Sequence, residues 1–199
     1  LMLVHSQAQR DFAEVKLAFA SEKIPLITPA VDDYFFRPTH NESVANRICA
    51  AGWRARDYQI LADAISVAPD YAADVVQHGA PTFMTQIPGN LNSVSASDYN
   101  ALRSIYSASS FVAVPLLDTD GSEGADSILQ AMAMGKAVVA TRTVGQPDLI
   151  IDGITGLSVA PGDVAGWRRA IALLRDDQVL RDRLGRNARR WIEEHAALD

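Results

Sequence analysis

Short apolar runs alternate along the chain with amphipathic stretches of helical period. Two continuous apolar runs cover residues 111–117 and 137–140, and a polar, glycine-containing loop follows the first of them. Runs that are apolar throughout are typical of parallel strands buried on both faces. Between them, residues 125–134 are small or apolar and end at Gly135, as expected for a helix and its C-terminal cap. Strand, loop, helix and strand in this order predict a right-handed crossover between parallel strands.

The same alternation extends over most of the chain. It predicts strands within residues 44–52, 73–79 and 91–94, and helices from Ser6 to about Ser21, after Tyr58, from a Ser97 N-cap to about Ser107, from Asp163, and from Asp176 to His195. From residue 44 onward, this order predicts an α/β fold with a doubly wound, Rossmann-like parallel sheet. Ligands of such sheets bind beyond the carboxyl ends of the strands.

Composition and charge narrow the function classes. The chain has 199 residues with 48% hydrophobic and 21% charged residues, which is the composition of a globular protein. A net charge of −6 argues against a nucleic-acid partner. The single cysteine, Cys49, cannot form an internal disulfide and favours a reducing compartment. The four histidines are scattered, so no metal site is expected, and no apolar run approaches the length of a membrane span, roughly 18 residues.

The loop before residue 125 has the features of an anion site. The helix expected there would offer the backbone N–H groups of Ala125, Asp126 and Ser127 together with the positive end of its dipole. Across the sheet, the turn after the strand within 44–52 contains Gly52, Arg54 and Arg56. Guanidinium groups at a strand end suit phosphate oxygens, although both arginines could be ordinary loop residues.

An ordered set of motifs follows that loop. An Ala-Met-Ala-x-Gly helix end leads into a Val-Val-Ala-Thr strand, and spaced glycines then lead to Pro-x-Asp. The residues are Ala131, Met132, Ala133, Gly135, Lys136 to Thr141, Gly145, Ile150, Gly153, Gly156, Leu157, Val159, Pro161 and Asp163. The pattern resembles the donor-binding signature of glycosyltransferase family 4, the retaining nucleotide-sugar enzymes of GT-B fold. Residues 24–38 resemble the interdomain hinge of that family.

The resemblance implies a domain organisation and an activity. Residues 1–38 would be the tail of an N-terminal domain with its linker, and residues 39–199 the donor-binding domain. The enzyme would transfer a hexose from a UDP- or GDP-sugar, without a cofactor, to a saccharide or glycolipid acceptor that a missing N-terminal domain binds. This piece alone would be inactive. Polysaccharide or glycolipid assembly in the cytoplasm, at the inner face of the membrane, is the implied setting.

Two positions depart from the family pattern. The family pairs two glutamates, and the corresponding positions hold Ser122 and Gln130, with Glu123 adjacent to the first. The resemblance implies that Ser122 or Glu123 contacts the donor sugar and that Gln130 contacts the ribose. It also places Ser95 near the nucleotide base. Asp126 would repel a phosphate, so we expect its side chain to point away from it.

The departures leave other interpretations open. Loss of both glutamates is compatible with a catalytically inactive, partner-binding module. A nucleotide-sugar epimerase would need catalytic carboxylates and a histidine that the sequence does not place. A flavodoxin- or receiver-like domain does not explain residues 145–163.

The arginines of the last helix are typical of a membrane-surface helix, but its acidic residues favour a solvated face. His78, after the second expected strand, is interpreted as a turn residue, and residues 143–146 are expected at the ligand-binding edge.

Overall fold

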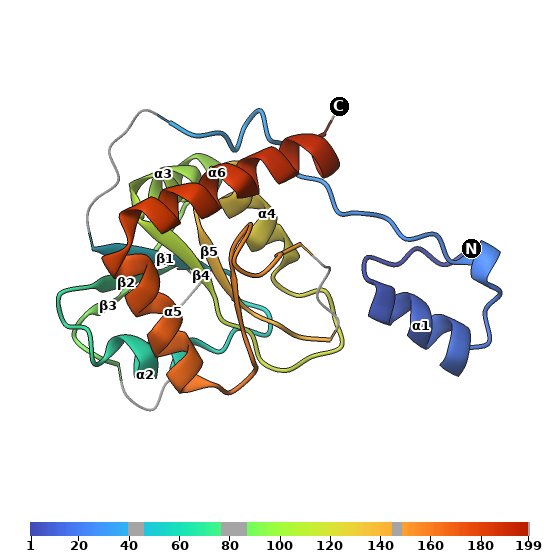
Figure 1. The fold of residues 1–199 in the computed structure, drawn as a ribbon, viewed down its shortest axis with the longest axis horizontal. Coiled ribbons are helices and arrows are strands. Elements are labelled where there is room, and N and C mark those ends of the chain that lie inside the picture. Colours follow the sequence, from blue (N-terminus) through green and yellow to red (C-terminus); the bar gives the residue numbers. More distant parts are fainter. Residues whose placement is uncertain (40–45, 77–86, 145–148, 199) are drawn as a thin grey trace.

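A six-stranded parallel sheet forms the centre of the molecule in the computed structural model, which describes residues 1–39, 46–76, 87–144 and 149–198. The strands are β1 (Arg47–Ala51), β2 (Ala72–Val76), β3 (Leu91–Val94), β4 (Phe111–Val114), β5 (Val138–Thr141) and β6 (Leu157–Val159). Their order is β3-β2-β1-β4-β5-β6, and all neighbouring pairs are parallel (Figure 1). The predicted doubly wound sheet is therefore confirmed. Its order reverses between β1 and β4, which is where such sheets bind ligands.

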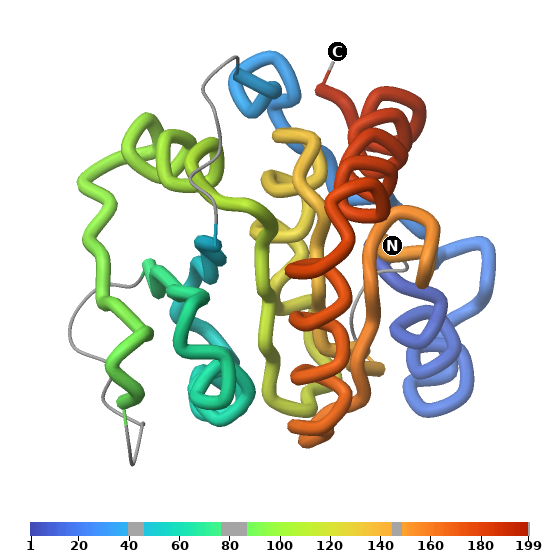
Figure 2. Tube along the Cα trace, turned by 60° about the vertical axis from the view of Figure 1, so that its left-hand side comes forward, coloured from blue at the N-terminus to red at the C-terminus, as the bar shows by residue number. Residues whose placement is uncertain are grey.

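Helices cover both faces of the sheet. They are α1 (Gln7–Lys16), η1 (Ser21–Lys23), α2 (Tyr58–Ile65), α3 (Tyr99–Ala108), α4 (Ala125–Ala133), α5 (Val164–Asp176) and α6 (Gln178–His195). Residues of α2 and α5 pack in one hydrophobic cluster with the sheet, and residues of α3, α4 and the second half of α6 pack in the other (Figures 1 and 2). The sheet is thus the middle of three layers.

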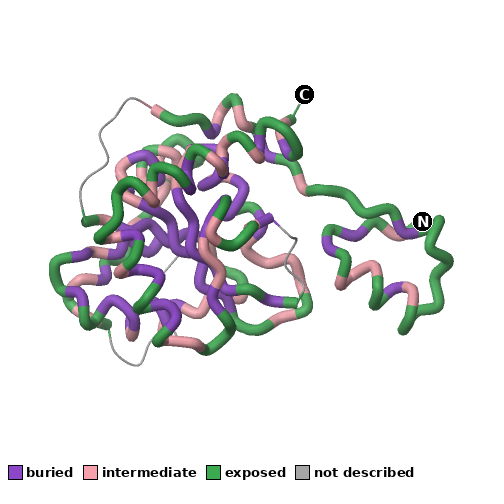
Figure 3. The backbone as a smooth tube through the Cα atoms, viewed as in Figure 1, coloured by how far each residue is buried: buried purple, intermediate pink, exposed green. Residues whose placement is uncertain are grey.

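Alternation along the central strands builds both clusters. In β1, Ile48 and Ala50 face one cluster, whereas Cys49 and Ala51 face the other. All four residues are at most 4% exposed, and Figure 3 shows the buried segments concentrated in the sheet. Parallel strands buried on both faces require apolar residues at every position. This requirement explains the unbroken apolar runs in the sequence.

Two predicted helix boundaries were wrong. Asp98, not Ser97, is the N-cap of α3, because its carboxylate accepts the Ala101 N–H at 2.8 Å. The first helix, expected to reach Ser21, ends at Lys16, and Ala18 then adopts a left-handed conformation. Its start is as expected: Ser6 Oγ accepts the N–H of Gln9 at 3.2 Å.

The N-terminal segment forms a small unit beside the main body (Figure 1). Val4 pairs with Leu26 in a parallel bridge, and Val4, Ala13 and Ile24 form their own small cluster. Phe12 and Val15 of α1 are 56% and 76% exposed. The segment therefore has the connectivity of a β-α-β unit with an open apolar face.

The linker returns the chain to the main body before residue 39. Val31 and Phe36 are buried in the cluster with α4 and α6, and the Val31 N–H donates to the Ala196 carbonyl at 2.9 Å. Packing of the main body thus reaches back to Val31, although a domain boundary near residue 38 remains a prediction.

Candidate functional site

A cavity of about 400 Å³ opens where the order of the strands reverses. The turn after β1 forms one wall, α3 a second, and the loop before α4 with its first turns a third. The lining residues are Ala51, Gly52, Trp53, Arg54, Arg56, Tyr99, Leu102, Tyr106, Ser122, Glu123, Gly124, Ala125, Asp126, Ser127 and Gln130. The structure therefore brings all but one of the predicted site residues into one cavity.

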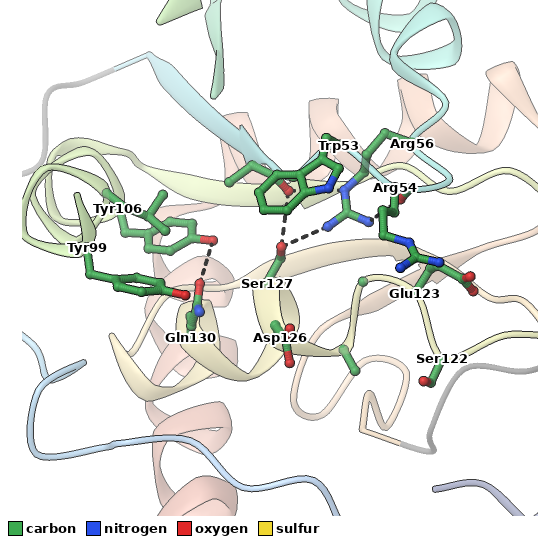
Figure 4. A pocket seen from close by; sticks show the side chains of 15 residues that line it. Trp53, Arg54, Arg56, Tyr99, Tyr106, Ser122, Glu123, Asp126, Ser127 and Gln130 are labelled. Carbon is green, nitrogen blue, oxygen red and sulfur yellow. Dashed lines mark hydrogen bonds between the residues drawn. The ribbon is translucent and has the colours of Figure 1, made fainter. Parts of the chain in front are cut away.

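Arg56 joins two walls of this cavity (Figure 4). Its Nε donates to the Ala51 carbonyl at 3.1 Å, and its Nη1 to the Arg54 carbonyl at 3.2 Å. Its Nη2 donates to Ser127 Oγ in α4 at 2.8 Å. A guanidinium has five N–H donors, and the Tyr58 side chain is a further hydrogen-bond neighbour of Arg56, so not all five donors are occupied. The side chain is thus oriented in advance, with donor capacity left over.

Burial tunes the groups around Arg56. Removal from water lowers the pKa of Arg56, while the neighbouring Tyr58 and Tyr106 oppose this shift. Burial also raises the pKa of Tyr58, whose hydroxyl donates to the Gly52 carbonyl. An arginine remains charged despite such a shift. The cavity therefore contains the partly buried positive charge of Arg56, which favours an anionic ligand.

The amino end of α4 faces the same cavity. Its N-cap is Gly124, which has a φ of 88° and no side chain to cap the helix. The prediction that the Ala125 amide is free was wrong, because this amide donates to the Ser122 carbonyl at 3.3 Å. The tight turn that Gly124 permits allows this bond. Among the described residues, the backbone amides of Asp126 and Ser127 have no hydrogen-bond partner and remain available to an anion.

Acidic side chains in the loop before α4 and in α4 itself partly offset the positive charge of this region. Thr119 Oγ1 donates to Glu123 at 2.9 Å. Hydrogen bonds from its own backbone and from Thr119 lower the pKa of Glu123, and Arg54 adds to this shift. Asp126 is exposed and lines the rim, with its side chain pointing away from Arg56 in Figure 4. Glu123 is therefore an anion at neutral pH that can accept hydroxyl groups.

Gln130 and Tyr106 line the cavity from α4 and α3, and Gln130 also lines an adjoining cavity. The Tyr106 hydroxyl donates to Gln130 Oε1 at 3.3 Å (Figure 4). Tyr106 is 0% exposed, and burial raises its pKa, so the hydroxyl stays protonated. Tyr106 lies at an apolar position of the predicted helix, and this pattern does not indicate its polar role. Trp53 and Tyr99 were missed as lining residues, although Trp53 adjoins Gly52 and Arg54.

Not every predicted residue reaches the cavity. Ser95 is exposed and does not line it, so its contact with a base remains a prediction. A second cavity of about 280 Å³ shares Trp53 and Tyr99 with the first and extends to Ser97 and Asp98. His78 and residues 145–148 lie outside the described part of the chain.

Two further kinds of feature are absent from the described residues. Within residues 1–39, 46–76, 87–144 and 149–198, no group of three or more histidine, cysteine or acidic side chains could hold a metal ion. In the same residues, no helix combines the length and the apolar character needed to cross a bilayer.

Comparisons with known proteins agree with this geometry. A family model described as "Glycosyl transferases group 1" matches residues 85–177. A D-inositol 3-phosphate glycosyltransferase of Corynebacterium diphtheriae is 38% identical over 96 residues, which is 48% of this chain and 21% of that protein. The matched part spans about one fifth of the length of the curated relatives.

Solved structures share the fold. The C-terminal domain of a glycosyl transferase group 1 family protein from Francisella tularensis has a TM-score of 0.71 at 21% identity, covering 85% of this chain and 100% of that one. The Anabaena protein HepE in complex with UDP has a TM-score of 0.85 at 16% identity, covering 99% of this chain and 60% of that one.

The parallel sheet, with its cavity at the reversal of strand order, has the α/β, Rossmann-like fold of the C-terminal domains of GT-B glycosyltransferases. Within it, residues 85–177 are similar to the glycosyl transferases group 1 family.

Proposed function

We propose that this chain is the donor-binding domain of a retaining glycosyltransferase that transfers a hexose from a UDP- or GDP-sugar. The observation that carries the proposal is that Arg56 and the uncapped start of α4 line one cavity. A diphosphate there would meet the Arg56 guanidinium from one wall and the amides of Asp126 and Ser127 from the other. No metal or cofactor is part of the proposal, because these fixed cations and dipoles neutralise phosphate charge.

The remaining lining residues would contact different parts of the nucleotide sugar. Ser122 and Glu123 in the loop before α4, and Arg54 in the turn after β1, would contact the donor sugar. Gln130, in α4, would contact the ribose. The adjoining cavity with Trp53 and Tyr99 would take the base, since aromatic rings offer stacking surfaces. The leaving phosphate would help to deprotonate the acceptor, so the chain supplies no nucleophile of its own.

The groups that bind the acceptor would belong to another domain of the enzyme. The open apolar face of the N-terminal β-α-β unit supports the proposal that it belongs to an N-terminal domain that binds a saccharide or glycolipid. Residues 1–199 alone would then bind the donor but transfer nothing. We place the activity in polysaccharide or glycolipid assembly in the cytoplasm.

Association with the inner face of the membrane would need a free basic surface. In α6, Arg181 and Arg189 are occupied by backbone carbonyls, which leaves Arg183, Arg186 and Arg190 for anionic lipid. Cosedimentation with vesicles containing phosphatidylglycerol would measure that contact.

Equilibrium dialysis with radiolabelled UDP-glucose and GDP-mannose tests donor binding. We expect binding by the wild-type chain and at least tenfold weaker binding by Arg56→Met, while the exposed Arg186→Met control binds as the wild type. Transfer would be measured with the intact protein and its N-terminal domain. Absence of binding at millimolar donor would contradict the proposal and favour a non-catalytic, partner-binding module.

A further inference from the structure

The orientation of the Gln130 amide determines whether this side chain offers a ligand a hydrogen-bond donor or an acceptor. Gln130 Oε1 accepts the Tyr106 hydroxyl at 3.3 Å, from the wall that α3 forms. With the oxygen engaged there, the NH₂ group is the part of the side chain left for the cavity. Nε2 has no hydrogen-bond partner among the described residues. Gln130 therefore presents a donor, whereas a glutamate at this position could only accept.

Tyr106 is held firmly enough to impose this orientation. It is 0% exposed, and its ring packs edge-on against that of Phe36 with centroids 6.5 Å apart. Its hydroxyl remains a donor at neutral pH because burial raises its pKa. A buried tyrosine hydroxyl needs a partner; Gln130 Oε1 accepts its proton, and the Ser127 side chain is a second hydrogen-bond neighbour of the hydroxyl. Rotating the amide would place two donors against each other unless the hydroxyl also turned.

We propose that Tyr106 is a positioning residue that fixes Gln130 as a hydrogen-bond donor, so that the site selects a nucleotide whose ribose oxygen accepts at this point. This inference rests on the proposed function, because it takes the ligand to be a nucleoside diphosphate. A ribose hydroxyl can accept or donate, so it suits either side chain. A ribose methyl ether can only accept, and it therefore distinguishes a glutamine donor from a glutamate acceptor.

The first experiment separates donor from acceptor. Titration calorimetry would compare UDP and GDP with their 2′-O-methyl and 3′-O-methyl ethers, on the wild-type chain and on Gln130→Glu. We expect the ether of the contacted hydroxyl to lose at least fivefold more affinity with Gln130→Glu than with the wild type. Steric effects of the methyl group are common to both proteins. Equal losses in both proteins would overturn the inference.

The second experiment tests whether Tyr106 acts through Gln130. We expect Tyr106→Phe and Gln130→Ala each to weaken UDP or GDP binding three- to tenfold, and the double variant to bind no more weakly than Gln130→Ala. Tyr71→Phe, which removes the hydroxyl of a tyrosine in the other hydrophobic cluster, is the control. Additive losses would show a merely structural role for Tyr106 and overturn the inference.

The two proposals fail differently. Nucleotide binding that Tyr106→Phe and Gln130→Glu leave unchanged would overturn this inference alone. Absence of binding of any nucleotide to the folded wild-type chain would overturn the proposed function and this inference with it. If Tyr106→Phe does not fold, the Gln130→Glu comparison still tests whether Gln130 acts as a donor, because it leaves Tyr106 in place.

Discussion

A β-carbon on residue 52 would lie 2.3 Å from Nη2 of Arg56. Gly52 also has a φ of +121°, which side-chain-bearing residues rarely adopt. Glycine at this position therefore makes room for the guanidinium beside the end of β1. We expect Gly52→Ala to reduce the free energy of unfolding by about 1–3 kcal/mol. Because the guanidinium must move, we also expect at least tenfold weaker nucleotide binding, measured by urea unfolding and calorimetry.

Two other glycines distinguish the effect of backbone strain from the effect of displacing the Arg56 guanidinium. Gly153 has a φ of +72° but open space around its Cβ position, and Gly89 has open space without a positive φ. Gly153→Ala should lose stability but not nucleotide affinity, and Gly89→Ala should change neither. Unchanged affinity in Gly52→Ala would show that Arg56 does not need its observed place.

Ser127 supports Arg56 from the opposite wall. Its hydroxyl accepts from Arg56 Nη2 at 2.8 Å and donates to the Ala51 carbonyl at 3.1 Å, and the residue is 7% exposed. We expect Ser127→Ala to cost about 1–2 kcal/mol of unfolding free energy and to weaken nucleotide binding severalfold. The exposed Ser104→Ala in α3 is the matched control. Wild-type affinity in the Ser127→Ala variant would show that the backbone carbonyl partners of Arg56 are enough to orient its guanidinium.

The sequence was sufficient to predict which segments meet at this site, but not how their side chains connect. The carboxyl ends of parallel strands share one edge of the sheet, so Arg56 and the start of α4 were expected together. The bond between Arg56 and Ser127 joins residues 71 positions apart and depends on rotamers that no local pattern specifies. The Ala125 amide was lost as a donor because the turn at Gly124 closes onto Ser122.

Lys136 should make stability rise with pH over a defined range. Its Nζ donates to the carbonyls of Ser107 and Ser109 at 2.7 and 2.8 Å, and burial lowers its pKa to about 8. In the unfolded chain its pKa is about 10.4. Between these values the unfolded state binds more protons, so the contribution of Lys136 to stability increases with pH; below pH 8 it is constant.

Comparison with Lys136→Met isolates this effect. We expect the difference in unfolding free energy, wild type minus variant, to increase by about 1–2 kcal/mol from pH 7.5 to 10, after allowance for the partial exposure of the group. The raised pKa values of Cys49, Tyr58 and Tyr106 act in the opposite direction, and these groups are present in both proteins. Urea titrations at intervals of half a pH unit would measure the difference. A flat difference would mean that Lys136 titrates normally.

Arg189 connects the linker to α4. Its Nη1 donates to the carbonyls of Asp33, Phe36 and Ala133, at 3.0, 3.2 and 3.0 Å, and its Nη2 pairs with the Asp33 carboxylate at 2.9 Å. The side chains of the pair are 19% and 18% exposed. Ala133 is the last residue of the helix whose first turn lines the cavity. One guanidinium therefore holds the linker against the far end of the candidate site helix.

Removing this guanidinium should free the linker before it unfolds the domain. We expect Arg189→Met to lose about 1.5–3 kcal/mol of unfolding free energy, as for hydrogen bonds to charged groups. Chymotrypsin should cleave it faster than the wild type after Tyr34, Phe35 or Phe36, because local opening then exposes these bonds. Arg190→Met, an exposed neighbour on the same helix, should behave as the wild type. Equal cleavage of both variants would show that the pairing of Val31 with Ala196 suffices to hold the linker.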